Sequence, residues 1–326
     1  MDISVSYLGK KIDNPIVVAS SNLTSTFEKV KKCEEAGAGA VVLKSLFEEQ
    51  ISSDVSENTS TEMEAMHPEA GEYLRGMGMR HNADSYLELI EQAKNNLSIP
   101  VFASLNCISD KWWTEYAKSI QSSGADGIEL NISIMPNSKK DSPRHIEEKT
   151  VSIVNKITRK VDIPVAVKIG PYYTSLAQLA EEIYQAGAAG LVLFNRFYQP
   201  DVDIDDLSLV SRYQFSSSSE NYNTLRWLGL LYENIDADLI ATTGIHTGTD
   251  FIKQLLAGAS SVQICSTLFL NGLERINELK INLQNWMENH NFNSVADFRG
   301  KASQKHSDKP EYYERLQYIK ALVGIS

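Results

Sequence analysis

Cysteine is scarce in this sequence. The 326 residues include three cysteines, Cys33, Cys107 and Cys265, which lie far apart along the chain. Their spacing matches no zinc, iron–sulfur or disulfide pattern, so we predict no metal site and no cross-links. A chain of this length buries enough apolar surface to fold without them. The expectation that follows is a reducing compartment, the cytoplasm.

Long apolar runs and an excess of positive charge are also missing. No run reaches the roughly 18 apolar residues that cross a membrane, and the opening MDISVSYLGKK has no apolar stretch typical of a signal peptide. The net charge of −11 disfavours nucleic-acid phosphates, which need a basic surface. We therefore predict neither a membrane nor a nucleic acid as partner, and we read the acidity as an aid to solubility.

Short runs of apolar, often β-branched residues recur down the chain. Most lack polar alternation, as expected for parallel strands buried on both faces. Helix-like stretches lie between most of them and end near Gly37, Gly124, Gly187 and Gly258. The pattern predicts an α/β fold, a (β/α)8 TIM barrel, as a single domain over residues 1–326. The eight predicted strands are Pro15–Ala19, Ala40–Leu43, Pro100–Ala103, Gly127–Leu130, Pro164–Val167, Gly190–Phe194, Asp238–Ala241 and Ser261–Ile264.

Three connections are long, namely residues 45–80, 132–145 and 195–225. Each follows the carboxyl end of a predicted strand, and barrel active sites are built at that end. Long loops in a compact domain usually form lids or walls of a site. We expect these βα loops to surround a binding pocket at the C-terminal face of the barrel.

Polar side chains occur where the predicted strands end. Any one of them alone is equally well explained as a cap for the following helix. Together they predict two lysines and several amides around one barrel mouth, which suits an anionic ligand. A lysine at the N1/O2 edge of a flavin would stabilise the reduced ring, and a Schiff-base lysine is the rival chemistry. The residues, in strand order, are Ala19, Ser20, Ser21, Lys44, Ser45, Asn106, Asn131, Lys168, Asn195 and Arg196.

The last two strands carry a phosphate-binding pattern. Thr243 and Gly244 follow the seventh strand, and Cys265 and Ser266 follow the eighth. Barrel phosphate sites are formed by these two loops together with the start of a short helix. The pattern does not by itself separate FMN from a sugar phosphate. Cys265 is expected to be a small packed residue rather than a nucleophile.

The sequence resembles the class 1 dihydroorotate dehydrogenases along nearly its whole length. The resemblance implies FMN in the barrel mouth, with its phosphate on the last two loops and a pyrimidine stacked on the flavin. It implies FMN contacts from Ala19, Ser20, Lys44, Ser45, Asn106, Asn131, Lys168, Thr243, Gly244, Cys265 and Ser266. The matching segments are NPIVVAS (14–20), VVLKS (41–45), GMGM (76–79), ELNIS…PN (129–137), PVAVKIGPYY (164–173), TTGIHTGTD (242–250), VQICSTL (262–268) and SVADFRGK (294–301).

The same resemblance indicates the catalytic and substrate-binding residues. Catalysis is expected from Lys44 and Asn131, with Ser133 as a weaker candidate. The substrate side is expected to be lined by Met77, Gly78, Met79, Asn137 and Asn195, and Arg75 and Arg196 are added because they stand where the family has an asparagine and a serine.

One departure from the family concerns the proton acceptor. Family members carry a cysteine or serine before a proline, and this residue is the general base. Here the segment reads NISIMPN, is one residue longer, and has Ile134 or Met135 at that position. A positioned base contributes typically 10²–10⁴-fold in rate, so its loss favours a changed substrate.

Two further departures concern charge and the flavin loop. Arg75 and Arg196 would suit a second carboxylate or a phosphate on the substrate. Their alternative is a surface ion pair with a loop acid such as Glu72 or Asp201. Ser217 and Ser218 stand roughly where flavin-contacting glycines occur in the family.

Several functions are compatible with these residues. The first is an FMN-dependent oxidoreductase acting on CH–CH groups, which oxidises dihydroorotate to orotate in pyrimidine biosynthesis. The alternative is a divergent member that keeps FMN and acts on another anionic substrate. A sugar-phosphate barrel lyase without flavin and a non-catalytic electron-carrying or regulatory subunit are further readings. The expected partners are a small anionic substrate, a second copy in a homodimer and an electron-acceptor protein, which would have to supply any iron–sulfur centre.

Overall fold

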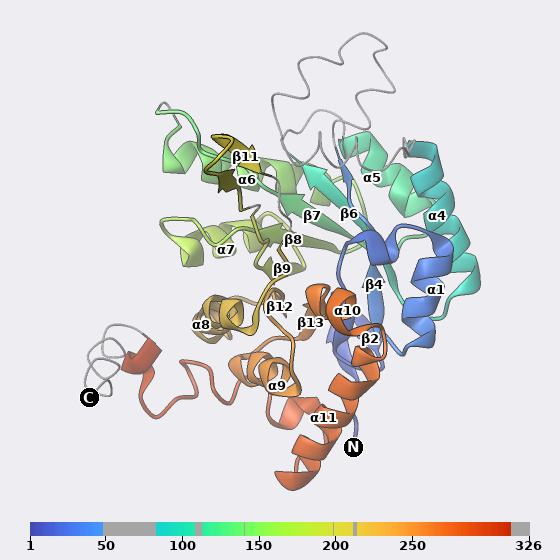
Figure 1. Ribbon diagram of the computed structural model, residues 1–326, viewed down its shortest axis with the longest axis vertical. Coiled ribbons are helices and arrows are strands. Elements are labelled where there is room, and N and C mark those ends of the chain that lie inside the picture. The colour runs from blue at the N-terminus through green and yellow to red at the C-terminus, as the bar shows by residue number, and fades with distance from the viewer. Residues whose placement is uncertain (48–82, 108–112, 140, 198, 211–213, 314–326) are drawn as a thin grey trace.

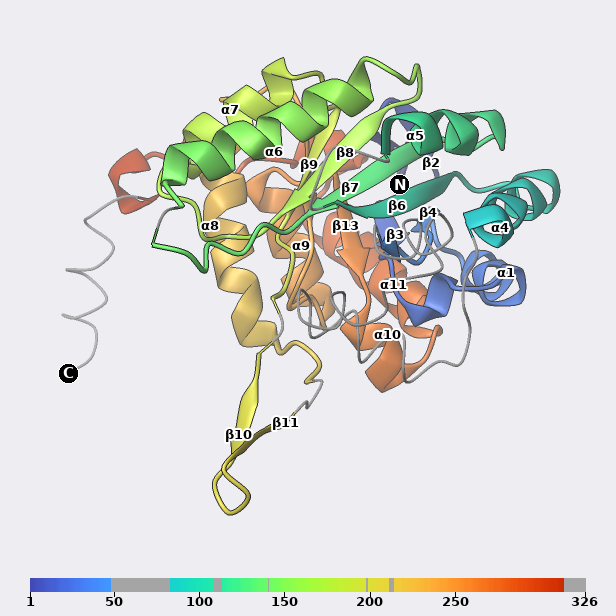
Figure 2. The same cartoon turned by 90° about the horizontal axis from the view of Figure 1, so that it is seen from above.

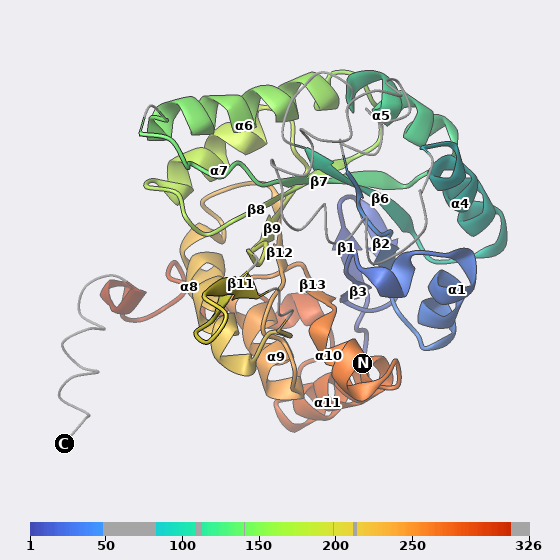
Figure 3. The ribbon, with the colours of Figure 1, turned by 45° about the horizontal axis from the view of Figure 1, so that its top comes forward.

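Eight parallel strand positions form a closed ring at the centre of the protein. The computed structural model describes residues 1–47, 83–107, 113–139, 141–197, 199–210 and 214–313. The ring runs β4-β3-β13-β12-β9-β8-β7-β6, and pairing of β4 with β6 closes it (Figure 3). All eight predicted strands are confirmed, and with them the (β/α)8 barrel. The strands are β3 (Ile16–Val18), β4 (Ala40–Val42), β6 (Val101–Cys107), β7 (Gly127–Ile132), β8 (Val165–Ile169), β9 (Gly190–Leu193), β12 (Asp238–Ala241) and β13 (Ser261–Ile264).

Helices surround the ring of strands (Figures 1 and 3). Their apolar faces join the strands in one core, and the glycines predicted to end four of them have φ between +90° and +120°. No helix of the described chain is both long and apolar enough to cross a membrane. The helices are α1 (Phe27–Glu35), α4 (Ala83–Asn96), α5 (Trp113–Ser122), α6 (Pro143–Thr158), α7 (Leu176–Gln185), α8 (Asn221–Leu231), α9 (Gly248–Ala257), α10 (Ser266–Asn271) and α11 (Arg275–Asn289), with short 3-10 turns η1 (Asn22–Thr24), η3 (Ser218–Glu220), η4 (Val295–Asp297) and η5 (Pro310–Tyr313).

An N-terminal hairpin fills the bottom of the barrel. Its strands are β1 (Val5–Tyr7) and β2 (Lys10–Ile12), which the sequence does not predict. The ring of Tyr7 is fully buried and packs edge-on against Phe102 of β6, with 4.7 Å between the ring centroids. The turn residue Leu8 is fixed by its N–H, which donates to the carboxylate of Asp238 at the start of β12 (2.7 Å). The ligand end of the barrel is therefore the opposite end.

The second barrel strand is interrupted where it reaches the mouth. After β4 the chain leaves the sheet and rejoins β6 as β5 (Leu46–Phe47). Leu43, Lys44 and Ser45 lie opposite Ala103 and Ser104, so this strand has one residue more than its partner. Such a bulge changes the direction of side chains and often lies next to a site. Here it sets the position of Lys44.

A second hairpin projects from the long connection after β9. Its strands are β10 (Asp201–Asp203) and β11 (Ser208–Val210), and Figure 2 shows it extending away from the barrel. Four apolar side chains on it are largely exposed, namely Val202 (56 %), Ile204 (80 %), Leu207 (86 %) and Leu209 (77 %). A two-stranded hairpin is marginally stable by itself in water. Exposed apolar side chains on such a hairpin suit a contact with another protein surface.

Candidate active site

A cavity of about 140 Å³ lies at the carboxyl ends of β3, β8, β9, β12 and β13. It contains seven of the residues predicted to bind the cofactor, and Asn195 and Arg196 from the predicted substrate side. Phe194, Ser216 and Gln263 also line it and were not predicted. The seven are Ala19, Ser20, Lys168, Thr243, Gly244, Cys265 and Ser266.

Amide side chains continue the site onto the neighbouring strands. Asn106, Asn131 and Lys168 are direct neighbours in the register of β6, β7 and β8, so their side chains leave the sheet on the same face. The amide of Asn195, after β9, donates to the side-chain oxygen of Asn131 (2.9 Å). Three amides and one cation, Lys168, therefore lie at these neighbouring strand ends. The sequence predicts a second lysine there, Lys44, but it is not among the residues that line this cavity.

Hydroxyl groups link the first three strand positions. The Ser20 and Ser45 hydroxyls are 3.0 Å apart, and Ser45 is 2.8 Å from the hydroxyl of Ser104. Ser104 is fully buried, and both its backbone N–H and its carbonyl bond to the hydroxyl of Tyr86 on α4 (2.8 and 3.2 Å). The Tyr86 hydroxyl thus satisfies two backbone groups of β6 opposite the bulge in the neighbouring strand. Ser104 and Tyr86 were missed at the sequence level.

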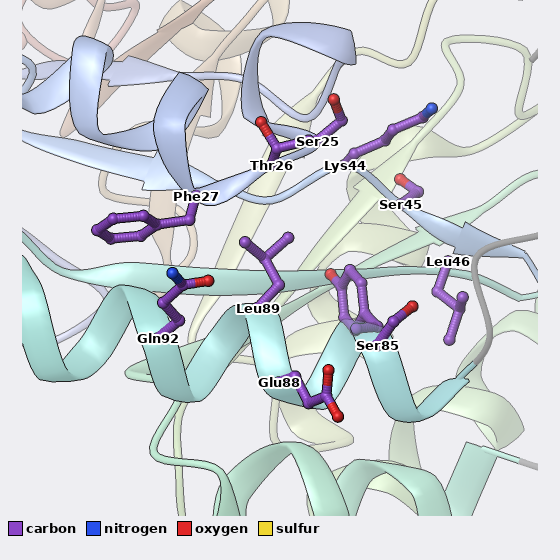
Figure 4. A pocket seen from close by; sticks show the side chains of 11 residues that line it. Ser25, Thr26, Phe27, Lys44, Ser45, Leu46, Ser85, Glu88, Leu89 and Gln92 are labelled. Atoms are coloured by element: carbon purple, nitrogen blue, oxygen red, sulfur yellow. The ribbon is translucent and has the colours of Figure 1, made fainter. Parts of the chain in front are cut away.

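Lys44 lies at this bulge with only 5 % of its surface exposed. Its backbone N–H donates to the carbonyl of Thr24 (3.3 Å), outside the barrel sheet. Burial, and then the nearby charge of Lys29, lower its pKa to about 8. Lys44 and Ser45 do not line the cavity at the barrel mouth; they border a separate cavity of about 220 Å³ between α1 and α4, and Figure 4 shows the Lys44 side chain directed away from Glu88 and Gln92 on α4.

The predicted phosphate loops have an unusual backbone. Thr243 and Gly244 both have positive φ (72° and 75°), and the Thr243 hydroxyl donates to the carbonyl of Phe194 (3.0 Å). A β-carbon at Gly244 would lie 2.5 Å from the backbone nitrogen of Asn221, so glycine is required there.

Ser216 bridges the two predicted phosphate loops. Its hydroxyl accepts from the N–H of Gly244 (3.3 Å) and lies 3.1 Å from the imidazole Nε2 of His246. Its own N–H donates to the hydroxyl of Ser266 (3.2 Å). The loop before α8 is therefore part of the site. Burial raises the pKa of the neighbouring Cys265 thiol, which suits a packed residue rather than a nucleophile.

A polar cluster lies under Lys168 in the barrel interior. The Lys168 ammonium is 3.5 Å from Oε1 of Glu129 and 3.4 Å from the side-chain oxygen of Gln263. Gln263, on β13, donates to Glu129, on β7, and so spans the barrel. Its amide nitrogen also lies 3.3 Å from the Tyr7 hydroxyl. Glu129 and Gln263 interrupt apolar strand runs in the sequence, and a polar residue in such a run is itself a signal.

Arg196 lines the cavity and also makes an ion pair. Its Nε donates to Glu220 (2.7 Å) and one terminal nitrogen donates to the carbonyl of Gln214 (2.5 Å). Both side chains are about a quarter exposed. The anticipated ion pair with a loop acid therefore exists, with Glu220 rather than Asp201 as the partner, and it fixes the loop that carries Ser216.

The loop after β7 carries the segment at which the resemblance implies a general base. Ile134 is half-buried against the core and Met135 is 57 % exposed, and neither side chain accepts a proton. Ser133 is buried. Asn137 is exposed, with its N–H on the carbonyl of Met135 (3.0 Å). The predicted substrate residues Arg75, Met77, Gly78 and Met79 lie outside the described residues.

Comparisons with known proteins agree on one family. The family model for dihydroorotate dehydrogenase matches residues 2–287. The chain is 28 % identical over 283 residues to the catalytic subunit of dihydroorotate dehydrogenase B (NAD(+)) of Methanocaldococcus jannaschii, which covers 83 % of this chain and 89 % of that one. It is 26 % identical over 316 residues to the subunit of the same name from Thermoplasma volcanium (92 % and 98 % covered). A putative dihydroorotate dehydrogenase A (fumarate) from Aeropyrum pernix is 24 % identical over 306 residues (92 % and 97 %).

Proposed function

This chain belongs to the dihydroorotate dehydrogenase family, and we propose that it is an FMN-dependent oxidoreductase that acts on CH–CH groups, with dihydroorotate as its substrate. The observation that carries the proposal is the barrel mouth itself, where Lys168, Asn131 and Asn195 lie beside the Thr243–Gly244 and Cys265–Ser266 loops. A planar, anionic heterocycle with a phosphate tail needs this combination of a cation, amides and backbone N–H groups.

The donor set fits FMN. The N–H groups and hydroxyls of Thr243, Gly244 and Ser266 suit the phosphate, and the Lys168 ammonium and the Asn131 amide suit the polar edge of the ring. FMN, when bound, supplies the hydride acceptor. The chain's own residues then have two tasks: to hold an anionic substrate against the ring, and to remove one proton from it. Asn195 is our candidate for the first task.

The proton requires a group other than the family's cysteine or serine. Ile134 and Met135 have no proton-accepting atom, and the Ser133 hydroxyl needs an activating base. Lys44 is the better candidate, because a pKa of about 8 leaves a substantial fraction of neutral amine at mildly alkaline pH. We therefore expect kcat/KM to rise with pH through about pH 8 if the Lys44 amine takes the proton.

One specific observation favours a second substrate. The apolar pair Ile134–Met135 at the expected base position suits a substrate whose oxidation or reduction needs no proton transfer to a side chain there. The candidate is another small anionic compound. Arg196 adds little to this argument, because its guanidinium is already paired with Glu220 and bonded to the carbonyl of Gln214.

Cofactor identification and a turnover assay test these proposals. Heat-released cofactor should run as FMN on chromatography, and well-folded protein without flavin would refute the cofactor. Turnover of dihydroorotate is then measured with NAD⁺ and with fumarate, since relatives named for either acceptor match this chain. Rates of roughly 1–10³ s⁻¹ are typical of enzymes and would support dihydroorotate. Rates far below that range with FMN bound would favour the second substrate.

We propose two protein partners, an electron-acceptor protein and a second copy of the chain. Several relatives are named as catalytic subunits, which supports the first. The β10–β11 hairpin supports the second, because exposed apolar side chains at Ile204, Leu207 and Leu209 suit burial in an interface. Light scattering should find a dimer for the native chain and a monomer for Leu207→Ser/Leu209→Ser. A monomeric native chain would contradict the homodimer.

A further inference from the structure

The barrel interior holds a charged pair that the proposed reaction does not use directly. Glu129 is 1 % exposed, and its Oε1 lies 3.5 Å from the ammonium of Lys168, whose side chain is 12 % exposed. That oxygen accepts no hydrogen bond among the described residues. An ionised carboxylate taken out of water is costly unless a charge or strong donors compensate it. The position of such a carboxylate in the middle of an apolar strand therefore points to a role that a neutral residue cannot fill.

The neighbours of this pair are neutral and hold it in one geometry. Gln263 bonds to both partners, because its oxygen faces Lys168 and its nitrogen faces Glu129. The Tyr7 hydroxyl lies beside the Gln263 nitrogen (3.3 Å). Burial, and then the charge of Glu129, raise the pKa of Tyr7, so this hydroxyl is uncharged at neutral pH. The formal charges of the cluster are those of Glu129 and Lys168.

The polar cluster of Tyr7, Glu129, Lys168 and Gln263 lies directly beneath the cavity and forms part of its floor. Lys168 and Gln263 both line the cavity at the mouth, whereas Glu129 and Tyr7 lie beneath them. Gln263 stands on β13 and Glu129 on β7, so the contact crosses the barrel and the pair cannot shift without repacking the interior. The positive charge presented to a ligand in the cavity is therefore that of a lysine with a fixed carboxylate behind it.

We propose that Glu129 is a positioning and charge-balancing residue: it holds the Lys168 ammonium at the floor of the cavity and offsets part of its charge, and so limits how strongly the site favours reduced over oxidised FMN. This inference rests on the proposed FMN function. The physical basis is Coulombic, because a cation beside the ring stabilises the negative charge gained on reduction, and an anion behind that cation weakens the effect.

The test is the reduction potential of the bound flavin in the intact holoenzyme. Glu129→Gln keeps the shape and removes the charge. We expect at least a tenfold increase in affinity for reduced relative to oxidised FMN, which is a rise of about 30 mV for this two-electron couple. Tyr7→Phe removes a hydroxyl from the same cluster without changing its charge, and its potential should stay at the native value.

Asp238→Asn is the control for charge removal, because it neutralises a partly buried carboxylate at the opposite end of the barrel. Its potential should also equal that of the native protein. An unchanged potential in Glu129→Gln with FMN bound would overturn the proposal, as would an equal rise in Asp238→Asn. Should Glu129→Gln fail to fold, Glu129→Asp retracts the carboxylate from Lys168 and should raise the potential by a smaller amount; no rise would overturn the proposal. A folded native chain that binds no added FMN would instead refute the proposed function.

Discussion

Tyr86 offers a direct test of how the barrel mouth is built. At the bulge of the second strand, three residues (43–45) lie opposite only two residues of β6, and the Tyr86 hydroxyl bonds to both the backbone N–H and the carbonyl of Ser104. Tyr86→Phe removes this hydroxyl and nothing else. Ser104 is fully buried and Tyr86 is 5 % exposed, so the groups left behind have little access to water.

The expected loss of stability follows from these contacts. A buried donor or acceptor left without a partner costs about 1–3 kcal/mol, and here one hydroxyl serves an N–H at 2.8 Å and a carbonyl at 3.2 Å. We therefore expect Tyr86→Phe to lower the free energy of unfolding by about 1–3 kcal/mol. In urea titrations of the apo protein, the midpoint should fall while the slope stays unchanged.

Tyr184→Phe on α7 is the control for Tyr86→Phe. Tyr184 is a half-buried tyrosine packed against the core, and its hydroxyl makes no hydrogen bond within the described chain. Its substitution should leave the midpoint unchanged. Equal midpoints for native, Tyr86→Phe and Tyr184→Phe protein would refute the reasoning and mean that water or the adjoining strand satisfies Ser104.

Three further outcomes are expected. Burial raises the pKa of Asp250, but hydrogen bonds, first from Ser218, outweigh it, so the net pKa lies below the ordinary value. The ionised carboxylate therefore stabilises the fold fully above the unfolded pKa, about 4, and this contribution is lost as the pH falls through the folded pKa. Asp250→Asn should lower the melting temperature at neutral pH, and the difference from the native protein should shrink in acid. Ser216→Ala leaves the Gly244 N–H unpaired and should destabilise the apo protein by about 1–3 kcal/mol, and added FMN should restore the melting temperature if its phosphate binds that N–H. Lys44→Ala should lower the potential of bound flavin, and an unchanged potential would mean that Lys44 only packs.

The strands of this barrel are readable from sequence because both of their faces are buried. Runs such as Gly190–Phe194 and Pro15–Ala19 are short and wholly apolar, which is typical of parallel strands buried on both faces. The polar residues that end them, such as Lys168 and Asn131, converge simply because parallel strands place their carboxyl ends at one edge. Many residues of the candidate site can therefore be predicted from the local sequence alone.

The remaining features depend on contacts that no local pattern encodes. The hairpin around Tyr7 is too short to show an alternation, and the bulge at Lys44 appears only when the register of the neighbouring strand is known. Ser216 reaches Gly244 across 28 residues of chain. Gln263 reaches Glu129 across 134 residues, and although its polarity in an apolar run is visible in the sequence, its partner is not.

The candidate site is divided between residues on barrel strands and residues on loops. Lys168, Asn131 and the Thr243–Gly244 turn lie on or directly after rigid barrel strands, braced from below by Glu129 and Gln263. Changes there would disturb buried charges and the closed sheet together, at a cost of several kcal/mol. The expected base position, Ile134–Met135, lies on the loop that follows β7, where Met135 is 57 % exposed and its substitution costs little stability. Selection for a new substrate would thus act on the loop while the cofactor half of the site stays fixed.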